Sequence, residues 1–173
     1  MQQYLITTLE VADLSRSMSV HVDEDKIDTY IRESESIDIK SALGDAFYLD
    51  VREHPEKYAL LLDGGTYEDK CGEKKIFMGI KTALAYYTYA RIVKNGDLNV
   101  TRYGLMQKED EYSSRPDIKE KVMAYNDAFS IADRYLKECV RFLEEKKADY
   151  PLYKGSGKIK ANRTVFRLSL IHI

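Results

Sequence analysis

The sequence lacks Trp altogether and has few of the residues that interrupt regular structure. It contains 3 Pro and 9 Gly among 173 residues, which argues against a disordered chain and against a turn-rich β-sandwich. It has only 2 Cys, Cys71 and Cys139, and no signal peptide is visible, so we expect a reduced, intracellular protein. A disulfide between the two cysteines stays open. No second Cys or His lies at ligand spacing from either one, which argues against a metal site.

Long apolar runs and catalytic motifs are absent as well. The most apolar stretch, 76–93, carries Lys81 and Arg91, so we expect no membrane-spanning helix. The chain has neither the G-x-S-x-G pattern of serine hydrolases nor the H-E-x-x-H pattern of zinc peptidases. Its Gly-bearing stretch 63–75 lacks the spacing of a phosphate-binding loop. We therefore expect a protein that is not an enzyme and has no catalytic residue, metal or cofactor.

Charge is divided unevenly along a chain whose net charge is −2. The segment 23–38 is rich in acid, and we interpret acid pairs such as Glu33 and Glu35 as parts of a solvated face rather than as catalytic pairs. From Tyr150 onward every charge is positive, which gives +5 for the tail and leaves −7 for the rest. Such a tail is either solvated or binds a neighbouring copy or a phosphate backbone. The candidate subunit or DNA contacts are Lys154, Lys158, Lys160, Arg163 and Arg167.

Tyr is the abundant residue, with 14 Tyr against 5 Phe. A Tyr ring packs like Phe, but its hydroxyl needs a partner or water, so many Tyr suit core edges and subunit interfaces. Tyr86, Tyr87 and Tyr89 fall within one predicted helix. Successive helical residues point about 100° apart, so contacts are expected around most of that helix.

Apolar periodicity and capping signals predict a mainly α fold, a small helical bundle with two long helices. Asp23 is expected to cap a helix that runs to about Ser36, and Gly44 is expected to separate a short helix from the next one. The two long helices are expected at 76–94 and at about 114–147. The remaining expectations are shorter helices at 45–53 and 55–62, an extended or β-prone N-terminal segment at 1–22, a loop at 63–75 and a strand or hairpin at 99–106.

The last long helix carries the clearest pattern. Ser114 and Asp117 match a capping box at its start. Its apolar residues recur with a period of about 3.5, the spacing of a seam that packs against another helix. That seam lies either on the central helix of the same chain or in a self-associating coiled coil. The seam residues are Ile118, Val122, Tyr125, Phe129, Ala132, Leu136, Cys139 and Leu143.

The pattern changes near Pro151, so we divide the chain into a helical domain, 1–149, and a C-terminal part, 150–173. The C-terminal part begins as a basic linker with Gly and Lys and ends in a β-prone arm at 164–173. A lone strand exposes its backbone groups, so the arm is expected to pair with residues 1–11 or with a neighbouring subunit.

Four stretches of the chain carry a resemblance to known proteins. They are DKIDTYIRESE at 25–35, LGDAFY at 43–48, LLDGGTY at 61–67 and FMGIKTALAYYTYA at 77–90. Over about residues 4–147 the chain resembles a family of small helical proteins from prophages and phages of Bacteroides-type bacteria. Beyond that family, it resembles the head–tail connector (adaptor) proteins of tailed phages.

The resemblance implies a virion structural protein, present in the host cytoplasm during assembly, that forms a ring of about twelve copies beneath the portal. Such a ring extends the DNA channel, contacts portal and tail proteins, and offers non-specific contact with DNA. The resemblance supplies no catalytic residues. The alternative is a helical protein–protein interaction or regulatory module that dimerises through the seam.

Overall fold

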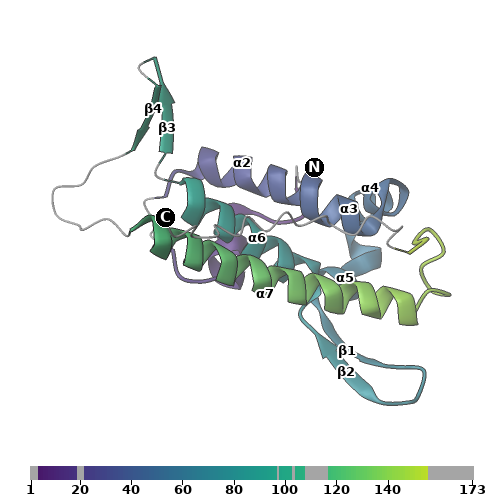
Figure 1. The fold of residues 1–173 in the computed structure, drawn as a ribbon. Helices are drawn as coiled ribbons and strands as arrows, with labels where there is room; N and C mark the ends of the chain where they lie inside the picture. Colours follow the sequence, from purple (N-terminus) through teal and green to yellow (C-terminus); the bar gives the residue numbers. More distant parts are fainter. Residues whose placement is uncertain (1–3, 19–21, 97, 103, 108–116, 156–173) are drawn as a thin grey trace, which may run out of the picture.

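The computed structural model describes residues 4–18, 22–96, 98–102, 104–107 and 117–155. They form an elongated, mainly helical body with two small antiparallel hairpins (Figure 1). The mainly α prediction is confirmed at this level. The elements in chain order are α1 (Thr8–Leu14), α2 (Glu24–Ser34), the π-helical turn η1 (Glu35–Ile39), α3 (Lys40–Leu43), α4 (Asp45–Glu53), the 3-10 turn η2 (Pro55–Tyr58), α5 (Ala59–Asp63), β1 (Gly65–Glu68), β2 (Lys74–Phe77), α6 (Gly79–Asn95), β3 (Leu98–Thr101), β4 (Gly104–Gln107) and α7 (Ile118–Glu145).

The N-terminal segment departs from the extended, β-prone stretch predicted at 1–22, because α1 lies within it. The Thr7 hydroxyl accepts a hydrogen bond from the Glu10 N–H at 3.2 Å, and the Glu10 carboxylate accepts one from the Thr7 N–H at 2.8 Å. This capping box pairs backbone donors that a helix start otherwise leaves unpaired. Val11 then packs into the core. Residues 8–11 are therefore helical and offer no strand to the C-terminal arm.

The helix predicted from Asp23 to about Ser36 begins as expected and continues further. The Asp23 side chain accepts from the Asp25 N–H at 3.1 Å. After α2 the chain stays helical through η1 and α3, and it leaves the helix at Gly44, which has a φ of 80°. A π turn inserts an extra residue into the helix, and here it carries the buried Glu35. The predicted break at Gly44 and the predicted helix 45–53 are confirmed by α4.

The stretch 63–75, predicted as a loop, forms most of the β1–β2 hairpin instead. At its tip the Asp69 carboxylate accepts backbone hydrogen bonds from two residues of the turn. Tyr67 and Phe77 are buried because both rings lie against Phe142 of α7. The central helix therefore starts after the hairpin rather than at 76 as predicted. The hairpin predicted at 99–106 is confirmed as β3–β4.

Two glycines allow the close approach at the base of the β1–β2 hairpin. Gly64 and Gly79 have φ values of 83° and 82°, which favour glycine. A Cβ on Gly79 would lie 2.4 Å from the Gly64 nitrogen and 2.4 Å from the Leu62 carbonyl oxygen. The end of α5 and the start of α6 therefore touch backbone to backbone.

α6 and α7 form the central antiparallel pair, which confirms the prediction of two long helices. The Tyr87 and Phe129 rings have centroids 4.9 Å apart, and at the other end Phe77 stacks on Phe142 at 4.5 Å. The capping box at the start of α7 pairs Asp117 with Glu120. Ser114, the predicted capping residue, lies outside the described residues.

The seam of α7 packs on α6 of the same chain over most of its length. Ala132, Cys139 and Leu143 are buried. The first two turns differ, because Ile118 is 78% exposed and Val122 is 49% exposed. α7 has 28 residues and α6 has 17, so the start of α7 extends past the end of its helical partner. The prediction of packing within the chain is confirmed from Tyr125 onward and wrong for the first two turns.

Candidate assembly surfaces

The two hairpins lie at opposite ends of α6. β2 ends at Phe77, just before α6 begins, and β3 begins at Leu98, just after α6 ends. An α-helix rises about 1.5 Å per residue, so the hairpins are separated by roughly 25 Å along the helix axis. Within the described residues each sheet has only two strands. Each hairpin therefore presents backbone edges that another strand can pair with.

Three large apolar side chains are exposed at the start of α7, at the end of the body that carries the β3–β4 hairpin (Figure 1). They are Ile118, Val122 and Met123, whose exposed fractions are 78%, 49% and 72%. An apolar group of this kind at the end of an element is a common feature of contact surfaces. We call these three residues the apolar tip of α7.

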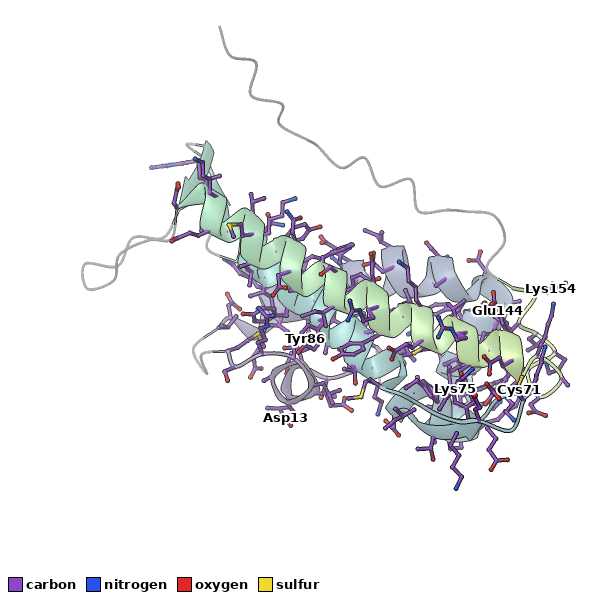
Figure 2. The ribbon with its side chains drawn as sticks, turned by 60° about the horizontal axis from the view of Figure 1, so that its bottom comes forward. Asp13, Cys71, Lys75, Tyr86, Glu144 and Lys154 are labelled. Atoms are coloured by element: carbon purple, nitrogen blue, oxygen red, sulfur yellow. The ribbon has the colours of Figure 1, made fainter. Side chains whose placement is uncertain are left out.

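The predicted contacts of the basic tail begin at the other end of the body. Tyr153 is fully buried, and its ring lies 5.6 Å from that of Phe47. The packed part of the chain thus reaches Tyr153, past the predicted boundary at 149. Lys154 follows and is exposed, at the same end as Lys75 and Cys71 of the β1–β2 hairpin (Figure 2). The other predicted contacts, Lys158, Lys160, Arg163 and Arg167, lie outside the described residues, as does the β-prone arm.

Glu35 is the most deeply buried charged residue of the described chain, with 1% of its surface exposed. Its carboxylate accepts hydrogen bonds from the Leu5 N–H at 2.9 Å and from the Tyr48 hydroxyl at 2.6 Å. Arg52 Nε lies 3.7 Å from the same carboxylate. Both oxygens are therefore engaged, and the interaction attaches the N-terminal segment to η1 and α4. The geometry indicates a structural role.

Tyr48 makes the stability of this network depend on pH. Burial and the adjacent Glu35 raise the pKa of Tyr48 from 10.0 to about 12. Because the folded-state pKa lies above the unfolded one, Tyr48 contributes stability that is fully present below about pH 10 and is lost as the pH rises to about 12. Tyr48→Phe is expected to lower the free energy of unfolding by about 1–3 kcal/mol at neutral pH. In urea unfolding, the difference in the free energy of unfolding between wild type and Tyr48→Phe should shrink as the pH rises from about 10 to about 12.

Tyr86→Phe is the matched control for this prediction. The Tyr86 ring packs edge-on against Tyr135 at 5.6 Å, and its hydroxyl makes no hydrogen bond to the described residues, so Tyr86→Phe should leave the stability at neutral pH nearly unchanged. Equal effects of the two substitutions would contradict the role assigned to the Tyr48 hydroxyl.

A second buried polar group joins η1 to α6. Arg91 Nη2 lies 2.8 Å from Asp38 Oδ2, and the Arg91 Nη1 donates to the Ser34 hydroxyl at 3.0 Å. Burial raises the pKa of Asp38, and the adjacent Arg91 guanidinium does not fully compensate. This pair orients η1 against α6.

A cavity of about 460 Å³ lies between the N-terminal segment and the α4–α5 region. Lys81 in its wall is 3.1 Å from a carboxylate oxygen of Glu10 and 2.9 Å from one of Asp63. Arg52, also in the wall, pairs with Glu35. These two cations are therefore paired with carboxylates of the same chain.

The two cysteines are both free thiols, Cys71 exposed and Cys139 buried. The disulfide that the sequence left open is therefore not formed. Burial raises the pKa of the Cys139 thiol to about 12, and the thiolate is the reactive form.

A disulfide reagent at neutral pH is expected to modify Cys71 quickly and Cys139 only after unfolding. Cys71→Ser should abolish the fast phase, and two fast thiols in the wild type would contradict the buried position of Cys139.

Among the described residues, no group of three or more His, Cys, Asp or Glu side chains is placed to hold a metal ion. None of the helices in that part of the chain is long and apolar enough to cross a membrane.

The fold and surfaces define a small, mainly α-helical protein with a hairpin at each end of its central helix. The chain belongs to a family of unknown function, DUF6712, whose profile matches residues 39–163. That match runs from the end of η1 through α7 and includes both hairpins. Searches of curated proteins and of solved structures returned no match.

Proposed function

We propose that this protein is a virion structural protein, a head–tail connector subunit that forms a ring beneath the portal of a tailed phage or prophage. The observation that carries the proposal is the placement of one hairpin at each end of α6. A connector must contact one assembly above it and another below it. A subunit whose open strand edges lie at both ends of a rigid helical pair suits that requirement.

The rigidity of the body supports the same role. In α6, Tyr86 packs against Tyr135 and Tyr87 against Phe129 of α7, and Phe77 of β2 stacks on Phe142 near the end of α7. The polar groups inside the body are engaged in holding its elements together, as Glu35 and Arg91 illustrate. Such a rigid body keeps its two ends at a fixed distance and orientation, which suits a structural role better than a catalytic one.

The basic tail has a defined starting point in this proposal. Tyr153 anchors the chain in the core, and Lys154 emerges at the end of the body that carries the β1–β2 hairpin. From there the tail can reach a neighbouring subunit or the DNA in the channel. Its five cations would favour acidic protein surfaces or phosphates.

The test is assembly with the portal protein encoded by the same prophage. Native mass spectrometry and negative-stain imaging are expected to find a ring of about twelve copies on the portal. Free protein that is monomeric is compatible with the proposal, because a connector can assemble only on the portal. Protein that stays monomeric at high concentration and leaves the portal bare would overturn it. A gene position between portal or capsid genes and tail genes would support it.

The alternative is a helical interaction or regulatory protein, and the exposed apolar tip of α7 favours it. In that case the tip would join two copies, and Val122→Asp would dissolve a dimer into folded monomers. Phe129→Asp and Leu136→Asp serve as the contrast, because both side chains pack against the core and a buried unpaired charge destabilises the fold. A dimer that survives Val122→Asp would exclude the apolar tip as the interface.

A further inference from the structure

The outer face of α7 carries a row of cations. Arg134, Lys137 and Arg141 are spaced three and four residues apart, so they lie on one face of the helix. All three are exposed, and they lie opposite the buried residues Ala132 and Cys139. The same face also carries the acids Glu138 and Glu144. Within the described chain none of the three forms an ion pair. We call them the basic row of α7.

The outer face of α2 has the opposite charge. Asp25 and Asp28 are exposed, and the exposed Arg32 lies one turn after Asp28 on the same side. The helix cap adds Asp23 and Glu24, both also exposed. No ion pair to these four carboxylates occurs among the described residues. We call them the acidic start of α2.

These two surfaces lie on different helices that both pack on α6. Arg91 of α6 contacts Ser34 of α2, and the Lys26 ammonium donates to the Gly96 carbonyl at 2.9 Å. One turn earlier on α6, Tyr87 contacts Phe129 of α7. Figure 1 shows α2 and α7 flanking α6. The same views and contacts place the acidic start of α2 near the C-terminal end of α6, whereas the basic row of α7 extends toward the β1–β2 hairpin.

The basic row and the acidic start of α2 have opposite charge. A contact that brings the three cations of two copies together, or the four carboxylates of two copies together, is unfavourable. A head-to-tail contact of α7 with the α2 of another copy puts opposite charges together. Head-to-tail contacts close into rings when the rotation between copies allows it.

We infer that the basic row of α7 in one copy binds the acidic start of α2 in the next copy, and that this contact joins neighbouring subunits. The inference rests on the proposed ring and adds the residues of its subunit interface. Because the two surfaces sit at different heights along α6, the helices are tilted relative to the ring axis. The residues of this contact are distinct from those of the basic tail.

Charge reversal tests the contact. The first variant carries Arg134→Glu, Lys137→Glu and Arg141→Glu, and the second carries Asp25→Lys and Asp28→Lys. In either variant alone, the α7 surface of one copy and the α2 surface of the next copy carry charge of the same sign. The protein concentration at which half of the copies are associated should therefore rise on the order of tenfold or more. Mixing the two variants, or combining all five substitutions in one chain, should restore association. Glu53→Lys with Glu56→Lys, at exposed acids outside α2, should leave association unchanged.

A zero-length carbodiimide cross-linker supplies a second readout. It should join Asp28 to Lys137 only between copies, which a mixture of light and nitrogen-15 protein distinguishes by mass. Association should also weaken as salt rises, since exposed charges are screened.

Different outcomes test the contact between α7 and α2 and the connector role separately. Rings that form on the portal with unchanged affinity in the first variant overturn the inference and leave the connector role standing. Protein that never assembles, with or without the portal, overturns both. Loss of retention on a DNA duplex in the first variant, with assembly intact, would assign the basic row to phosphate binding and overturn the inference.

Discussion

Replacing Phe142 with Ala is expected to lower the free energy of unfolding by about 3–5 kcal/mol. Phe142 is 1% exposed. Its ring stacks on Phe77 at 4.5 Å and meets Tyr67 at 5.0 Å and Tyr150 at 5.7 Å. The substitution therefore opens a cavity where α7, the β1–β2 hairpin and the segment after α7 meet. Small domains have only about 5–15 kcal/mol of total stability, so the loss is a large share.

Urea unfolding followed by circular dichroism measures this loss, with Met123→Ala as the control. Met123 lies on the same helix and is 72% exposed, so its replacement should change stability by less than about 0.5 kcal/mol. Similar unfolding midpoints for the two variants would contradict the position of Phe142 at the centre of the aromatic cluster.

The helices that begin or end with local signals were predictable from the sequence. Asp23 and Gly44 mark their helix boundaries through capping and left-handed geometry, both of which act within a few residues. The helix 45–53 was predicted with its observed bounds for the same reason. Local chemistry fixes these boundaries, so no knowledge of the rest of the fold is needed.

The elements that were missed depend on distant contacts. The β1–β2 strands have four residues each, too few to show alternation, and their burial comes from Phe142 far along the chain. The π turn carries Glu35, whose partner is the Leu5 backbone N–H. α1 was missed although Thr7 and Glu10 match a capping box, a signal that the sequence did contain.

The candidate surfaces were predicted unevenly. The basic tail was found from charge counting alone, because no acid interrupts it. The basic row of α7 was missed, since Glu138 and Glu144 nearly balance it when charges are counted along the chain. The exposure of Arg134, Lys137 and Arg141 opposite the buried side of α7 becomes visible only once the packing of α7 on α6 is known.

Replacing Gly79 with Ala is expected to destabilise the protein by about 2–5 kcal/mol, because it combines two unfavourable effects. The φ of 82° at Gly79 disfavours any side chain. In addition, a Cβ would lie 2.4 Å from the backbone of Gly64 and of Leu62, where no flexible side chain can move aside. The start of α6 and the base of the hairpin would both have to shift.

Gly44→Ala separates these two effects. Gly44 has a φ of 80°, and a Cβ there would meet nothing within 4 Å, so only the backbone conformation is penalised, by roughly 1–2 kcal/mol. Urea unfolding should therefore give a clearly larger loss for Gly79→Ala than for Gly44→Ala. Because Phe77 precedes Gly79 and stacks on Phe142, hydrogen exchange in Gly79→Ala should also rise in β1 and β2. Equal losses in the two variants would mean that the backbone around Gly79 has room for a Cβ, contrary to the 2.4 Å approach to Gly64 and Leu62.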